Sequence, residues 1–246
     1  MHGSRHDHLV CELAERLGRA EHVVVYGPSG IGKSTLLREL GARLTAIGVQ
    51  WSMAPKAESL RDVVLALESL YPDGRGGGLL SPQRVRAQFC NVAETSRGAL
   101  LLDHVAGVGT ALKGFLRSLR GTRLGIAFAV DIDAPRDKDR MRRWCLSHRE
   151  FSVPPASSTR LRQMLVRANV ELGEPLSSEA IAHLVEAAQG RPGYITVCLE
   201  LLRDRRYWNG GRVHLTLLEN DSEIGTRNRG GWRRVPMVIR HPTRGT

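Results

Sequence analysis

A glycine-rich turn between a short apolar segment and a helical pattern is the feature of this sequence that most constrains its fold. Residues 22–37 read HVVVYGPSGIGKSTLL, and Gly27–Ser34 fits the phosphate-loop pattern G-x-x-x-x-G-K-[ST] at every fixed position. Glycines let successive backbone N–H groups turn inward around a polyphosphate, which a Cβ atom would obstruct. The helix that follows adds the partial positive charge of its N-terminus. The turn therefore predicts a strand–loop–helix unit that binds a nucleoside triphosphate.

The side chains of this loop suit ATP and Mg²⁺. Lys33 is long enough to reach the β- and γ-phosphates, and the Ser34 hydroxyl is an expected Mg²⁺ ligand. A turn that binds nothing is the alternative, which the strand-like segment before the loop and the helical pattern after it disfavour. The residues expected to contact the nucleotide in this loop are Gly27, Pro28, Ser29, Gly30, Ile31, Gly32, Lys33, Ser34 and Thr35.

Strand-like and helical segments alternate through the first 154 residues. Alternation of this kind is typical of a parallel sheet with helices on both faces. The expected fold class is therefore α/β, with a P-loop nucleotide-binding core over residues 1–154 and the ligand at the carboxyl ends of the strands. Strands are expected at 22–26, 49–54, 99–103, 124–130 and 150–153, and helices at 7–19, 33–47, 57–70, 81–95 and 108–120.

After residue 157 the pattern changes to helices. Apolar residues from Leu161 to Leu172 follow the i, i+3, i+4, i+7, i+11 spacing of one helix face. We expect a small all-helical lid domain over residues 155–205, followed by a basic C-terminal extension at 206–246. Within that extension, residues 213–218 are a candidate strand for a small hairpin with residues 207–208.

A carboxylate ends the apolar segment ALLLD at 99–103. Asp103 follows Lys33 with one predicted strand and two predicted helices between them, and a carboxylate at the tip of such a strand can hold Mg²⁺ through water. An ordinary strand-end aspartate is the alternative. His104 stands where enzymes that polarise an attacking water usually carry Glu. A neutral imidazole can act as a general base near pH 7, and a structural residue in a slow or inactive hydrolase is the other interpretation.

This layout resembles the AAA+ ATPases and the related STAND switch NTPases over about residues 5–205. Gly27–Ser34 and Asp103 match the two nucleotide-binding motifs of that family directly. Asp131, at the end of the next core strand, occupies the place of the first sensor, which in that family is usually Asn, Ser or Thr. Because a γ-phosphate would repel an ionised carboxylate, the resemblance leaves Asp131 the alternative of orienting water or Mg²⁺.

The resemblance also implies roles for two arginine-containing segments. Gly190–Gly193 (GRPG) resembles the second sensor of the initiator-like AAA+ clade and the G-x-P of STAND proteins, so Arg191 and Pro192 would sense the nucleotide from the lid. A plain turn between helices is the alternative. Residues 136–143 (RDKDRMRR) stand where such families place an arginine finger supplied to a neighbouring subunit, and the candidates are Arg140, Arg142 and Arg143. The implied catalytic set is Lys33, Asp103, His104, Asp131 and Arg143.

A formal net charge of +11 points to a polyanionic partner, and the initiator-like clade, which includes DNA replication loaders and transposition regulators, implies DNA. All but four of the 36 basic residues are arginine, a bias that a GC-rich genome also produces. Residues 227–246 carry six arginines, no acidic residue and Trp232, a combination suited to neutralising phosphates and stacking on a base. A solvated tail is the alternative.

Other features indicate a cytoplasmic protein that does not enter the membrane. There is no run of about 18 apolar residues, and the N-terminal MHGSRHDH lacks the apolar region of a signal peptide. Cys11, Cys90, Cys145 and Cys198 have no C-x-x-C spacing, which is typical of reduced thiols and not of a zinc site or a disulfide framework.

The expected function is an oligomerising ATPase that acts as a nucleotide-dependent switch on DNA, in replication, transposition or repair. The alternative is a STAND-like signalling scaffold that binds ATP, barely hydrolyses it and recruits a protein. An ABC-type ATPase is disfavoured because LSPQR at 80–84 lacks the glycine pair of the LSGGQ signature. A small-molecule kinase is disfavoured because its lid normally interrupts the core, whereas the helical region here follows it.

Overall fold

The core of the structure is a five-stranded parallel sheet. The computed structural model describes residues 5–71, 82–105, 109–131, 148–169, 172 and 175–229. The strand order is β2-β3-β4-β1-β5, and every neighbouring pair is parallel. The strands are β1 (His22–Gly27), β2 (Trp51–Ala54), β3 (Gly98–Leu102), β4 (Leu124–Asp131) and β5 (Arg149–Ser152).

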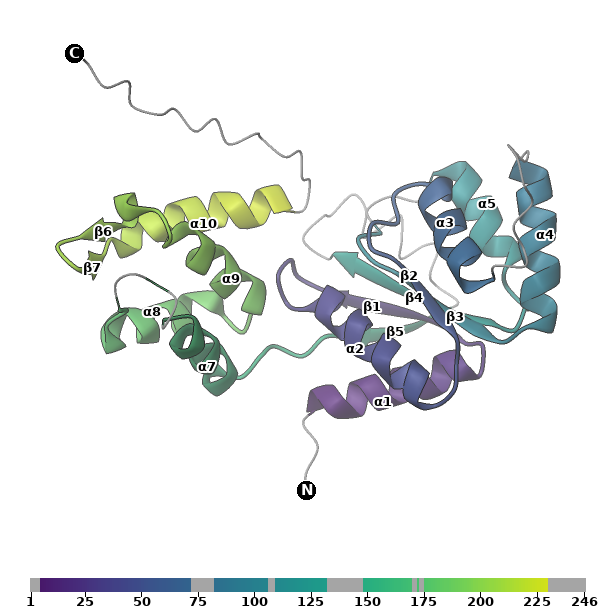
Figure 1. Cartoon of the computed structure of the whole chain (residues 1–246), viewed down its shortest axis with the longest axis horizontal. Coiled ribbons are helices and arrows are strands. Elements are labelled where there is room, and N and C mark those ends of the chain that lie inside the picture. Colours follow the sequence, from purple (N-terminus) through teal and green to yellow (C-terminus); the bar gives the residue numbers. More distant parts are fainter. Residues whose placement is uncertain are drawn as a thin grey trace, which may run out of the picture.

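Helices cover both faces of the sheet, with α1 and α2 on one side and α3, α4 and α5 on the other (Figure 1). Successive strand residues point to opposite faces, so the strands supply two separate cores. Val23 and Ala127 belong to the α1–α2 core, whereas Val24 and Phe128 belong to the other. The helices are α1 (Arg5–Gly18), α2 (Lys33–Ala46), α3 (Leu60–Leu70), α4 (Pro82–Thr95) and α5 (Thr110–Ser118).

A helical segment with its own core follows β5 and lies beyond one end of the sheet (Figure 1). Leu184, Ile195, Tyr207 and Leu218 are fully buried in it. The two short strands β6 (Trp208–Asn209) and β7 (Arg212–Val213) pair antiparallel between its helices. The helices of this segment are α7 (Ser158–Asn169), α8 (Ser178–Ala188), α9 (Pro192–Leu201) and α10 (Leu215–Arg229).

The predicted α/β fold class is confirmed, and the five predicted core strands all form with their ends within two residues of the expected positions. The expected small hairpin forms, with Trp208 paired to Val213. The extent of its second strand is wrong, because within 213–218 only Val213 is extended and α10 begins at Leu215. Helix α10 packs on α9, and Leu218 joins the core of the helical segment. Within the described ranges, no helix is long and apolar enough to cross a membrane.

Candidate nucleotide-binding site

The phosphate-loop sequence forms the turn from β1 into α2. Gly30 and Gly32 adopt φ values of 76° and 111°, a left-handed region that residues with a Cβ atom rarely enter. Gly32 is the N-cap of α2 and makes no side-chain cap hydrogen bond. A Cβ atom added to Gly32 would meet nothing within 4 Å, so there is open space at the start of α2. An anion in that space would face the helix N-terminus.

Lys33 folds back over the loop. Its Nζ donates hydrogen bonds to the carbonyl oxygens of Gly27 at 2.8 Å and Pro28 at 2.9 Å. Its ammonium also lies 3.8 Å from Oδ2 of Asp131. Strand register explains this ion pair, because Gly27 and Asp131 are direct partners on β1 and β4. The carboxylate at the expected sensor position therefore pairs with the lysine that precedes Ser34.

Asp103 lies just beyond the end of β3, the strand next to β4. Its backbone N–H donates to Ala54 O at 2.9 Å, and its carbonyl accepts from the N–H of Ala57 at 2.9 Å. These bonds fix the strand tip, and the residue is only 3% exposed. Oδ1 accepts a 2.9 Å hydrogen bond from the backbone N–H of His104. A nearly buried carboxylate with one oxygen so held suits a position beside Mg²⁺.

His104 is in the left-handed region, with φ of 50°. Its Nε2 lies 3.8 Å from Oδ2 of Asp103, and 58% of its side chain is exposed. Backbone strain of this kind in a residue with a Cβ atom is a common property of functional sites. The imidazole is therefore open to solvent beside the strand tip.

The first turn of α9 rests directly on the phosphate loop. The backbone N–H of Gly193 donates a 2.8 Å hydrogen bond to the carbonyl oxygen of Gly30. A Cβ atom added to Gly193 would lie 2.5 Å from Gly30 Cα, so the two backbones approach as closely as two glycines permit. This contact brings Arg191, the N-cap of α9, and Pro192, its first residue, to the same end of the sheet as the loop.

Arg191 itself is partly buried. Its Nε donates to the carbonyl oxygen of Ala188 at 3.3 Å, which holds the start of the side chain against the end of α8. Sequence reasoning identified this turn but missed the Gly30–Gly193 contact, although the second glycine of GRPG was the available signal. The candidate finger residues Arg140, Arg142 and Arg143 lie outside the described residues.

The loop, Asp103, Asp131 and the start of α9 thus meet at the carboxyl ends of β1, β3 and β4. The residues present fit Mg²⁺ and ATP in their chemistry. The loop offers glycine backbone, the open N-terminus of α2 and the Lys33 ammonium for phosphate. The Ser34 hydroxyl and the Asp103 carboxylate are oxygen donors of the kind that Mg²⁺ binds.

Among curated proteins, the chain is similar to the Holliday junction branch migration complex subunit RuvB of Campylobacter curvus. The two are 25% identical over 190 residues, which is 75% of this chain and 52% of the relative. The chain therefore spans about half the length of that curated relative. A comparison with protein-family models finds no match.

Solved structures show the same fold. Cdc6p from Pyrobaculum aerophilum has a TM-score of 0.58 at 13% identity, covering 80% of this chain and 60% of its own. Orc1 of Aeropyrum pernix, solved in complex with DNA, has a TM-score of 0.53 at 17% identity. The match covers 92% of this chain and 66% of Orc1. Domain III of Thermotoga maritima DnaA has a TM-score of 0.51 at 19% identity. The match covers 89% of this chain and 93% of the DnaA domain. The predicted resemblance is confirmed at the level of the fold, which the chain shares with these Cdc6p, Orc1 and DnaA structures.

Proposed function

We propose that this chain is an ATP-dependent switch that binds Mg²⁺ and ATP between the phosphate loop and the start of α9. The observation that carries the proposal is the convergence at one end of the sheet. There Lys33 and Asp131 pair at 3.8 Å, and Gly193 donates to Gly30 at 2.8 Å. A nucleotide in this place would touch both the core and the helical segment, which we propose as its lid.

Lys33 would exchange its present acceptors for phosphate. The carbonyl oxygens of Gly27 and Pro28 and the Asp131 carboxylate hold its ammonium now, and a polyphosphate offers more charge at the same place. Mg²⁺, when bound, supplies neutralisation of the β- and γ-phosphate oxygens. Ser34 and Asp103 are the side chains that would hold it. In this arrangement Asp131 would orient water or the hydrated metal.

Hydrolysis would depend on His104. The imidazole is exposed and lies 3.8 Å from Oδ2 of Asp103. In this proposal it would accept the proton of the attacking water as a general base. The second candidate function is a STAND-like scaffold that holds ATP and recruits a protein. This candidate is favoured by His104, which stands where hydrolysing enzymes usually carry the glutamate that polarises the attacking water. Without that carboxylate, ATP would be held longer before hydrolysis.

The proposed partner is DNA, through the basic surface and the C-terminal residues. The printed names of the relatives support this part: RuvB as a branch migration subunit, Orc1 in complex with DNA and DnaA as a replication initiation protein. The net charge of +11 has the sign that a polyanion requires. We further propose ATP-promoted head-to-tail association, with Arg140, Arg142 or Arg143 completing the site of a neighbouring copy.

An ATP turnover assay with and without DNA tests the proposal. The wild-type chain should release phosphate slowly, and DNA should change the rate. His104→Ala should lose roughly 100-fold, the lower range for removing a general base. A His104→Ala rate equal to that of the wild type would show that the imidazole is not the base. Tight ATP binding with zero turnover in both proteins would favour the scaffold.

A further inference from the structure

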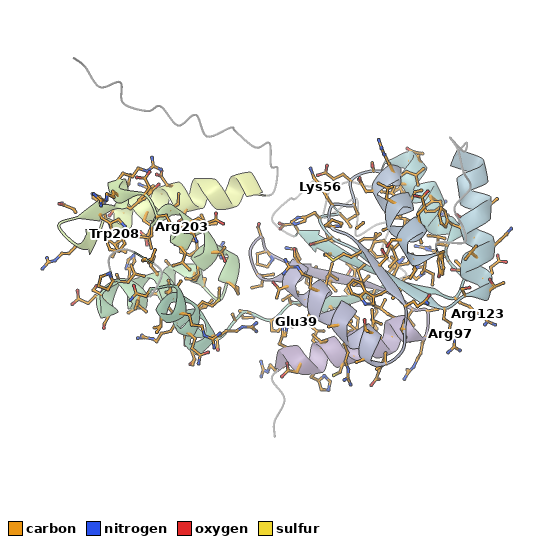
Figure 2. The ribbon with its side chains drawn as sticks, in the orientation of Figure 1. Glu39, Lys56, Arg97, Arg123, Arg203 and Trp208 are labelled. Carbon is orange, nitrogen blue, oxygen red and sulfur yellow. The ribbon has the colours of Figure 1, made fainter. Side chains whose placement is uncertain are left out.

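Five exposed arginines gather at the amino ends of the strands, opposite the nucleotide site. They come from different parts of the chain: the last turn of α5, the turn after it, and the residues at or just before the starts of β3, β4 and β5. Figure 2 shows two of them, Arg97 and Arg123, side by side at the end of the core away from the helical segment. We name this set the arginine edge: Arg97, Arg117, Arg120, Arg123 and Arg149.

Strand pairing fixes the closest two members. Gly98 and Leu124 are direct partners on β3 and β4, so Arg97 and Arg123 stand at the same level on strands about 4.8 Å apart. The backbone of Arg123 is held by a 2.7 Å bond from its N–H to Ala93 O. Two positive side chains that start from neighbouring positions on the same edge make this edge attractive to an anion.

Among the described residues, acidic side chains form few contacts with the edge. In the described part of the chain, Arg97, Arg117, Arg123 and Arg149 form no ion pair, whereas Arg16 has two carboxylate partners. Two exposed carboxylates, Glu94 and Glu150, lie near the edge in sequence, against five arginines.

A hollow of about 410 Å³ adjoins this edge. Arg120, from the turn after α5, and Arg149, from the start of β5, both line it. The side chains of His22 and His148 line it as well. The rings of His22 and His148 lie 5.5 Å apart. Among the lining residues that the structure describes, the one carboxylate is Glu21, which Arg16 neutralises at 2.8 Å. The hollow therefore combines two guanidinium groups with imidazole edges, which suits an oxyanion.

We propose that the arginine edge binds the sugar–phosphate backbone of a DNA strand, with one phosphate in the hollow between Arg120 and Arg149 and its neighbours on Arg97 and Arg123. This deepens the DNA part of the proposed function and rests on it. Guanidinium forks bind phosphate bidentately and read charge, not sequence. Since ATP would bind at the opposite ends of the strands, both ligands fit on the core at once.

Fluorescence anisotropy with labelled DNA tests this assignment. Arg97→Gln/Arg123→Gln should weaken binding at least about 10-fold at low salt. It should also reduce the slope of log K against log salt by about 2, since each phosphate contact contributes roughly 0.9 on duplex DNA. The matched control, Arg160→Gln/Arg162→Gln on exposed positions of α7, removes the same charge and should leave both quantities unchanged. Arg97→Lys/Arg123→Lys should restore most of the slope, and ATP affinity should be equal in all four proteins.

Each contrary outcome is distinguishable. Wild-type affinity and slope in the Gln pair would overturn the edge and leave DNA to another surface. An equal loss of DNA affinity in the α7 control would show that only the net charge matters, which would also overturn the assignment to the arginine edge. If Arg97→Gln/Arg123→Gln loses the binding to phosphatidylserine vesicles that the wild type has, and keeps wild-type DNA binding, the edge binds a lipid surface and the proposal is overturned. No DNA binding by the wild-type chain would overturn both the edge and the DNA part of the proposed function.

Discussion

The backbone N–H of Gly193 lies 2.8 Å from the carbonyl oxygen of Gly30, which joins the first turn of α9 to the phosphate loop. Both residues are glycines, and a Cβ atom on Gly193 would lie 2.5 Å from Gly30 Cα. A loop that rearranges around phosphate therefore displaces α9 or loses this bond. The contact is a direct physical link between the phosphate loop and the helical segment.

Gly193→Ala should break this link. The added methyl group forces the loop and α9 apart, which should lower the free energy of unfolding by about 1–3 kcal/mol and weaken ATP binding. Gly114→Ala, in α5, is the matched control, because its Cβ would meet nothing within 4 Å and alanine favours a helix by roughly 1 kcal/mol. Urea denaturation and ATP titration of both variants provide the measurement. Equal stability of the two would show that the close approach does not constrain α9.

Sequence patterns were sufficient for the sheet and insufficient for contacts between distant segments. Buried parallel strands such as β3 and β4 are continuous apolar runs, which a sequence displays directly. Residues 213–218 misled because Val213, Leu215 and Leu217 alternate, whereas Leu215 and Leu218 share a helix face in α10. Periodicity does not distinguish these readings in so short a run.

The candidate site was likewise predicted only in part from the sequence. The loop residues follow from a local pattern, and Asp103 from the strand that it ends. The pairing of Lys33 with Asp131 and the contact of Gly193 with Gly30 depend on which strands and helices become neighbours, which one sequence does not specify. The arginine edge was also hidden, because its members are scattered between residues 97 and 149 and only the strand order brings them together.

Asp103→Asn should weaken Mg²⁺ binding and leave the fold intact. Asparagine keeps an oxygen for the backbone N–H of His104, now 2.9 Å from Oδ1, so the strand tip should remain intact. The lost charge should raise the Mg²⁺ concentration needed for half-maximal ATP binding by about 10- to 100-fold. Nucleotide titrations across a range of Mg²⁺ concentrations measure this shift. An unchanged Mg²⁺ requirement would remove Asp103 from the metal site.

His104→Gly should stabilise the protein. Glycine enters the left-handed region freely, while His104 is held there at φ of 50°. Relief of this strain should raise the free energy of unfolding by up to ~1 kcal/mol. Chemical denaturation, with His104→Asn as a second variant that tolerates the same backbone region, gives the comparison. A loss of stability in both would mean that the imidazole supports the fold.

His22 should make stability fall in mild acid. Burial lowers the pKa of this imidazole, whose Nε2 donates to Leu124 O at 3.2 Å, and the nearby charge of Arg120 lowers it further. The unfolded chain then binds the proton more readily, so the free energy of unfolding decreases as pH falls below about 6.5. His22→Gln should flatten this decrease between pH 6.5 and 5, and exposed His8→Gln should not. Urea denaturation at several pH values measures it, and identical pH profiles for all three proteins would contradict the account.

The most direct test of the central claim is ATP binding by Lys33→Ala, measured by calorimetric titration in the presence of Mg²⁺. The variant loses the ammonium that now bonds to Gly27 O and Pro28 O and pairs with Asp131, and that would contact the β- and γ-phosphates. Lys113→Ala, on α5, is the matched control. The account predicts no measurable ATP binding for Lys33→Ala and wild-type affinity for Lys113→Ala. Wild-type affinity in Lys33→Ala would contradict it and place the nucleotide, if any, elsewhere.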